Sequence, residues 1–91
     1  MEVRARHILV GSEEKAKELL EQLNSGKKFA DLAMQFSKCP SGRKGGDLGS
    51  FKRGMMVPEF DRFCFTNKKG DKGIVKTQFG WHVIEINDIK K

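Results

Sequence analysis

The sequence predicts an α+β domain in which helices pack on an antiparallel sheet. Two amphipathic helical segments follow a single strand near the start of the chain, and two strands near its end are separated by only three residues. So short a connection joins antiparallel strands, because parallel strands need a long crossover. The first strand lies far in sequence from this hairpin, so helices packed on an antiparallel sheet fit better than a doubly wound parallel sheet.

Alternation of side chains predicts the first strand over residues 3–10. With a period of two, His7 falls on the same side as Val3, Ala5 and Leu9, so its imidazole is expected to face the core.

After the first strand, apolar residues recur with helical spacing in two segments. Ser12 is a suitable N-cap, with two acids in the first turn. The apolar stripe of this first helix is Ala16, Leu19, Leu20 and Leu23, and that of the next helix is Phe29, Leu32, Ala33 and Phe36. The first helix ends at Ser25-Gly26 and the second ends before Cys39-Pro40, and both are expected to share one core.

The middle of the chain is rich in turn residues. Between residues 39 and 46 the Pro, Ser and Gly content leaves room for at most one short helical turn, followed by a brief strand over 48–52. Pro58 suits the first turn of a third helix, which carries Val57, Phe60 and Cys64 on one face and ends near Asn67.

The last segment is expected to form the hairpin. Residues 68–73 read as an exposed loop, and strands over 74–77 and 81–89 meet across residues 78–80. In the last strand the period of two groups His82 with Ile84 and Ile86, so the second imidazole is also expected to face inward.

Length and composition indicate one domain over residues 1–91. A signal peptide or membrane span is not expected, because the apolar runs are short and the chain opens Met1-Glu2-Val3-Arg4. Two cysteines far apart in sequence favour reduced thiols and a cytoplasmic location, although counting does not exclude a disulfide.

The formal net charge of +6 comes from scattered lysines and arginines. It weakly favours acidic partners such as nucleic acid or anionic lipid, but no recognition pattern selects between them. A solvated surface that keeps a small monomer soluble is the more ordinary interpretation.

The two histidines and the thiol of Cys39 are the candidate functional residues. Since the glycine-rich passage after Cys39 could bring the thiol to both rings, a buried His/Cys/His cluster is the hypothesis to test. Each histidine taken alone would more often be a core residue that satisfies its own hydrogen bonds.

Five motifs together resemble the parvulin-type peptidyl-prolyl cis/trans isomerases over essentially the whole chain. They are Arg6-His7-Ile8-Leu9-Val10, Cys39-Pro40-Ser41-Gly42, Gly45-Gly46-Asp47-Leu48-Gly49, Met56-Val57-Pro58-Glu59-Phe60 and Thr77-Gln78-Phe79-Gly80-Trp81-His82. The resemblance implies a β-α-α-α-β-α-β-β order, with a four-stranded antiparallel sheet surrounded by four helices.

The resemblance also implies a site. It places His7, His82, Cys39 and Thr77 among the catalytic positions, with the histidines as a hydrogen-bonded pair and Thr77 as a hydroxyl partner. Leu48, Met56 and Phe60 match the proline pocket, and Phe79 matches a further substrate-binding position. No cofactor or metal is implied.

The implied activity is isomerisation of X-Pro bonds in unfolded or flexible proteins, without covalent attack by Cys39. Phosphate dependence is not expected. Gly11-Ser12-Glu13-Glu14 replaces the basic loop of phosphate-directed members, and Phe79 stands where those members resemble each other in having a small polar residue. Lys38 and Arg43-Lys44 near the expected cleft predict tolerance of acidic or neutral residues before proline.

Three alternatives remain open. A chaperone or binding module would use the same cleft and the basic surface without relevant turnover. A thiol hydrolase or transferase would use Cys39, a histidine and Asp47, but no oxyanion loop accompanies them. A structural zinc site would need two Cys and two His, whose spacing fits no paired-ligand pattern.

Overall fold

The computed structural model describes residues 1–90, which form four strands, three α-helices and one 3₁₀ helix. The elements are β1 (Glu2–Val10), α1 (Glu13–Asn24), α2 (Phe29–Phe36), the 3₁₀ helix η1 (Pro40–Lys44), β2 (Asp47–Lys52), α3 (Pro58–Thr66), β3 (Lys72–Thr77) and β4 (Gly80–Lys90).

The strands form one sheet in the order β2-β1-β4-β3, and every neighbouring pair is antiparallel. The first and last strands pair along almost their whole length, from Glu2 opposite Lys90 to Val10 opposite Trp81. The predicted α+β class with a four-stranded antiparallel sheet is therefore confirmed.

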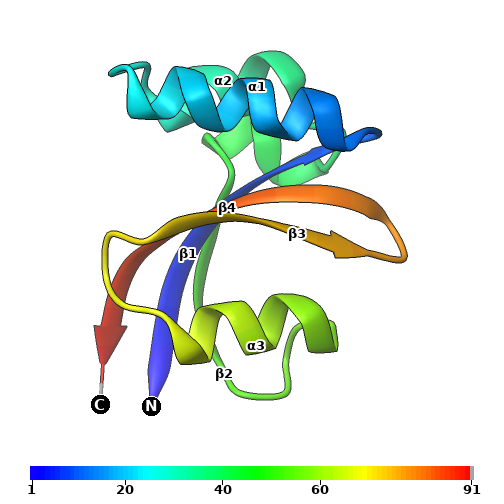
Figure 1. Cartoon of the computed structure of the whole chain (residues 1–91). Coiled ribbons are helices and arrows are strands. Elements are labelled where there is room, and N and C mark those ends of the chain that lie inside the picture. The colour runs from blue at the N-terminus through cyan, green and yellow to red at the C-terminus, as the bar shows by residue number, and fades with distance from the viewer. Residues whose placement is uncertain (91) are drawn as a thin grey trace.

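Helices cover both faces of the sheet. In Figure 1, α1 and α2 lie on one face and α3 lies on the other. On the first face Ile8, Val10 and Val83 pack with the apolar stripes of α1 and α2, so these two helices share one core, as their spacing predicts. On the other face a second core joins the central strands to α3; its buried members are Val3, Ala5, Phe51, Phe60, Cys64, Ile84 and Ile86.

Both histidines point to the α3 side of the sheet. His7 is two positions from Ala5 in β1, and His82 is two positions from Ile84 in β4, so each histidine shares the face of its apolar neighbour, as the period of two predicts. The exposed fraction is only 5% for His7 and 4% for His82. Because β1 and β4 are neighbours, the pairing of the central strands brings together two residues that are 75 positions apart.

Three details differ from the expectations. The fourth helix is a 3₁₀ helix, bounded by Pro40 at its start and by Gly45 in the left-handed conformation (φ 71°) at its end. β3 begins at Lys72, inside the expected loop, because Lys72 already pairs with Glu85 of β4. The hairpin loop has two residues instead of three, since Thr77 pairs with Gly80.

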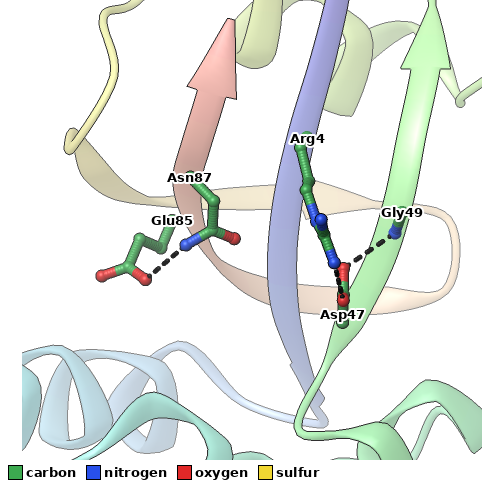
Figure 2. A network of polar contacts seen from close by, with 5 residues as sticks. All are labelled: Arg4, Asp47, Gly49, Glu85 and Asn87. Atoms are coloured by element: carbon green, nitrogen blue, oxygen red, sulfur yellow. Dashed lines mark hydrogen bonds and ion pairs between the residues drawn. The ribbon is translucent and has the colours of Figure 1, made fainter.

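Polar contacts fix the β1–β2 edge of the sheet. Figure 2 shows Asp47 accepting hydrogen bonds from the Arg4 guanidinium, at 2.7 Å, and from the Gly49 amide, at 2.9 Å. The Arg4 partner lowers the pKa of the Asp47 carboxyl. On β4, Asn87 donates to Glu85 at 3.0 Å. The Asp47 contacts anchor the start of β2, which carries Leu48 toward the α3 side.

None of the helices within residues 1–90 is long and apolar enough to cross a membrane.

Candidate active site

A cleft of about 360 Å³ lies on the α3 side of the sheet. His7, Cys39, His82, Leu48, Met56, Phe60 and Phe79 all line it. Of the predicted site residues only Thr77 does not line the cleft, and it lies behind His82. Segments from both halves of the chain thus meet around one hollow, as expected for a binding site.

The two imidazoles form a direct pair. Their Nδ1 atoms are 2.9 Å apart, and the rings are nearly parallel, with 15° between their planes. A hydrogen bond between two imidazole nitrogens needs one protonated nitrogen and one bare nitrogen. The tautomer of one ring therefore fixes the tautomer of the other.

Hydroxyl groups extend the pair at both ends. Ser41 Oγ lies 3.0 Å from His7 Nε2, and Thr77 Oγ1 lies 2.7 Å from His82 Nε2. The Phe79 amide in turn donates to Thr77 Oγ1 at 3.2 Å. This row of four side chains can form all of its hydrogen bonds in two ways. Every donated hydrogen points toward Thr77, or every donated hydrogen points toward Ser41.

Both rings are held neutral by their surroundings. Burial, followed by repulsion from His82, lowers the pKa of His7 to about 4. Burial also lowers the pKa of His82, with Glu59 acting in the opposite direction. An uncharged pair suits the apolar cleft, because a charged imidazole there would lose its hydration.

Phe60 lines the cleft and packs against both histidines. Its ring meets His7 edge-on with the ring centres 5.6 Å apart, and it meets His82 in the same way at 5.7 Å. Phe51 supports it from the far side at 6.1 Å. Phe60 is 3% exposed, so its ring holds the imidazoles in place as well as lining the cleft.

The loop between β2 and α3 places Met56 at the cleft. The buried carboxylate of Asp61 accepts a hydrogen bond from the Gly54 amide at 2.8 Å, and Arg53 approaches the same carboxylate at 3.7 Å. These contacts tie the loop to α3, whose first turn begins at Pro58. Met56 consequently packs against the second core, which contains Phe60, and lines the cleft together with Leu48.

Cys39 reaches the cleft through a connection to β1. The Lys38 amide donates to Leu9 O at 2.8 Å, and Ser37 Oγ accepts from the Leu9 amide at 3.1 Å and from the Cys39 amide at 3.3 Å. The half-buried thiol of Cys39 lines the same hollow as the two histidines. The thiol and the two imidazoles therefore lie around one cleft, as expected. The Nε2 atom of His7, however, is hydrogen-bonded to Ser41 and not to the thiol.

Gly46 allows η1 to approach the first histidine. Its carbonyl accepts from the His7 amide at 3.0 Å. Gly46 has a φ of +83°, and a Cβ at this position would lie 2.4 Å from His7 O. Only glycine fits, and its close approach sets Ser41 beside the His7 ring.

Sequence reasoning missed several contributors to the site. It did not assign a role to Ser41, although that residue lies in the quoted motif after Cys39. It also missed Leu9, Pro40 and Val57, which line the cleft. Alternation alone groups Leu9 with His7, so that signal was available.

The structure does not place Asp47 as the third catalytic residue that a thiol hydrolase would need. Asp47 bonds Arg4 and Gly49, while hydroxyl groups hold the outer nitrogens of both histidines. Cys64 is fully buried in the α3 core, and burial raises its pKa to about 12, so it is a packing residue. Within residues 1–90 no three His, Cys, Asp or Glu side chains group as metal ligands.

Comparison with known proteins agrees with this geometry. The family model of the PPIC-type PPIase domain matches residues 1–90. The chain belongs to this family. The resemblance to parvulins noted from the motifs is therefore confirmed.

Relatives of this PPIC-type domain include proteins of similar length and longer proteins. Foldase protein PrsA 1 of Bacillus cereus is 47% identical over 99% of this chain, which covers 32% of that relative. The chain thus spans about a third of the length of such curated relatives. The solution structure of NmPin, the parvulin of Nitrosopumilus maritimus, is 36% identical, with a TM-score of 0.87 and 96% of each chain covered.

A third relative comes from a structural study of two SurA-like chaperones, PEB4 and Cj1289, of Campylobacter jejuni. It is 40% identical, with a TM-score of 0.89, over 96% of this chain and 38% of that one.

Proposed function

We propose that this PPIC-type domain catalyses cis/trans isomerisation of X-Pro bonds in unfolded or flexible chains, and so assists protein folding. The observation that carries the proposal is an apolar cleft whose polar wall is a neutral, hydrogen-bonded histidine pair. The foldase names of the longer relatives support the same activity.

The chemistry required is rotation about a partial double bond, without bond cleavage. The barrier is about 18–20 kcal/mol, because resonance holds the amide planar. A twisted amide has lost that resonance, so it is less dipolar than the planar form. An apolar cleft favours the less dipolar state, and about 1.4 kcal/mol of selective stabilisation gives a tenfold rate gain.

The cleft offers a place for each part of the substrate. Leu48, Met56 and Phe60 form an apolar slot that suits a pyrrolidine ring. With the ring there, the preceding carbonyl lies toward Cys39 and the histidine pair. We assign the pair a positioning role, because both rings are neutral and their outer nitrogens are already bonded to hydroxyls.

Cys39 acts without covalent attack in this proposal. Covalent catalysis needs an activated nucleophile, usually with a base that takes its proton. In the described chain the His7 and His82 nitrogens bond each other and two hydroxyls instead. Cys39→Ser is expected to retain measurable isomerase activity, and mass spectrometry during turnover is expected to find no adduct. A covalent adduct of the peptide on Cys39 would reverse this assignment.

Phosphate is not required in this proposal. Two exposed acids, Glu13 and Glu14, occupy the first turn of α1 after β1. The deciding experiment measures cis/trans exchange by NMR in an Ala-Pro peptide and in its phospho-Ser-Pro counterpart. Acceleration of the Ala-Pro peptide is expected. Acceleration of the phosphorylated peptide alone would contradict phosphate independence, and acceleration of neither would contradict isomerase activity.

A binding module without relevant turnover is the second candidate, and the similarity to a SurA-like chaperone favours it. The same peptides distinguish the two functions. A chaperone would suppress aggregation of an unfolded protein while exchange in short Ala-Pro peptides stays at the spontaneous rate. An isomerase accelerates that exchange.

We also propose that the protein is a monomer and that it associates weakly, in a salt-sensitive way, with acidic surfaces, on the basis of its net charge of +6. Sedimentation of the protein with anionic vesicles or nucleic acid, at low and high salt, tests it.

A cytoplasmic location is proposed from the two free thiols. Fractionation of the source cells tests that location.

A further inference from the structure

Among residues 1–90, Lys38 carries the only charged side chain that lines the cleft. Lys38 stands at the rim beside Cys39, and the rest of the lining is apolar, apart from that thiol and the neutral histidine pair. A charge beside an apolar wall acts through less water than a charge on an open surface, so its field at the cleft is less screened.

A second hollow, of about 510 Å³, adjoins the cleft across the segment Lys38-Cys39-Pro40. Arg43 of η1 lines this hollow, and Met34 of α2 forms part of its wall. No acid lines either hollow within residues 1–90. A peptide that leaves the cleft over Cys39 therefore meets two cations.

The position of Lys38 is set by its backbone and by a glycine. Its amide donates to Leu9 O at 2.8 Å, which fixes the residue to the end of β1. A Cβ at Gly11 would lie 3.0 Å from Lys38 Nζ, so the absent side chain leaves room for the amine. Among the residues of the described chain, neither Lys38 nor Arg43 has a carboxylate within ion-pair distance.

We infer that this cleft prefers an acidic residue immediately before proline, with Lys38 as the specificity-determining residue. The inference rests on the proposed function, which places the proline ring in the apolar slot and the preceding residue beside Cys39.

The test compares X-Pro peptides that differ only at X. Glu and Gln have similar shapes, so the ratio of their kcat/KM values isolates the charge. For the wild-type protein we expect Glu-Pro to exceed Gln-Pro by about threefold to tenfold at low salt, and Lys-Pro to be the slowest. Salt should reduce the ratio.

Variants assign the preference to one residue. Lys38→Gln is expected to bring the Glu-Pro to Gln-Pro ratio close to one, and Lys38→Glu is expected to make Lys-Pro the better substrate. Lys44→Gln is the matched control, because Lys44 lies in the same 3₁₀ helix as Arg43 but lines neither hollow. It should leave the ratio as in the wild type.

The outcomes separate this inference from the function on which it rests. Equal rates for Glu-Pro and Gln-Pro in an active wild-type protein would overturn the charge preference alone. A preference that persists in Lys38→Gln would overturn the role of Lys38. Spontaneous exchange of every peptide, Ala-Pro included, would instead overturn the isomerase function.

Discussion

His7 and His82 face each other across β1 and β4 with their Nδ1 atoms 2.9 Å apart, so each ring keeps its other nitrogen for a hydroxyl. Since the central strand pair holds both backbones, the imidazoles are fixed in place before any substrate arrives. This preorganised and uncharged wall beside an apolar slot is the feature on which the proposed catalysis depends.

Removing the Thr77 hydroxyl is expected to weaken both the fold and the site. Thr77→Val leaves the buried His82 Nε2 without its partner at 2.7 Å. An unsatisfied buried polar group costs about 1–3 kcal/mol, so the free energy of unfolding should fall by that amount. Urea denaturation measures it, and kcat/KM for an Ala-Pro peptide should fall as the ring loses its orientation.

Thr77→Ser is the matched control for that substitution. It keeps the hydroxyl and removes only a methyl group, so the loss of stability should stay below about 1.5 kcal/mol. Equal effects of Val and Ser at this position would show that the hydrogen bond to His82 is unimportant.

Stability is expected to fall as the pH drops from about 6.5 toward 4. Burial lowers the pKa of His7 to about 4, whereas an exposed histidine in the unfolded chain titrates near 6.5. Between these values the unfolded state binds a proton that the folded state does not, so stability rises with pH and reaches its full value above 6.5. The change attributable to His7 is on the order of 3 kcal/mol.

Urea denaturation across this pH range, together with NMR titration of the imidazoles, tests the pH prediction. The His7 ring should remain neutral at pH 5. A His7 signal that titrates near 6.5 in the folded protein would contradict the burial argument.

Gly46→Ala is expected to destabilise the domain more than an ordinary glycine substitution does. Its Cβ would lie 2.4 Å from His7 O, and its φ of +83° disfavours an L side chain. A loss of about 2–4 kcal/mol in the free energy of unfolding is expected from steric conflict together with strain.

Gly70→Ala provides the comparison, since Gly70 has a φ of +91° but has no atom within 4 Å of the added Cβ. It should cost only about 1 kcal/mol. Similar losses in both variants would mean that the close approach of Gly46 to His7 contributes nothing.

Much of the fold could be predicted because local patterns determine it. Alternation along β1 and β4 predicted that each histidine faces the core, and helical spacing identified α1, α2 and their shared core. The pairing of β1 with β4 then sets both rings on the α3 side. The exact start of β3 was not predictable, because Lys72 joins the strand through Glu85 on a neighbouring strand.

Most of the predicted site residues line the cleft, but several of its other members and the contacts of the histidines were missed. The motifs pointed to His7, Cys39 and Met56, which do line one cleft. The partner of His7 could not be deduced from spacing, because the η1 turn determines whether a thiol or a hydroxyl meets the ring. The structure places Ser41 there, supported by the close approach of Gly46.

The most direct test of the central claim is isomerisation of an Ala-Pro peptide by two methionine variants. Met56 lines the cleft, whereas the neighbouring Met55 is 66% exposed and lies outside it. If the apolar slot stabilises the twisted amide, Met56→Ala should reduce kcat/KM by about tenfold or more. Each loss of about 1.4 kcal/mol of transition-state stabilisation lowers the rate tenfold. Met55→Ala should match the wild type. Equal activity of the two folded variants would contradict the account.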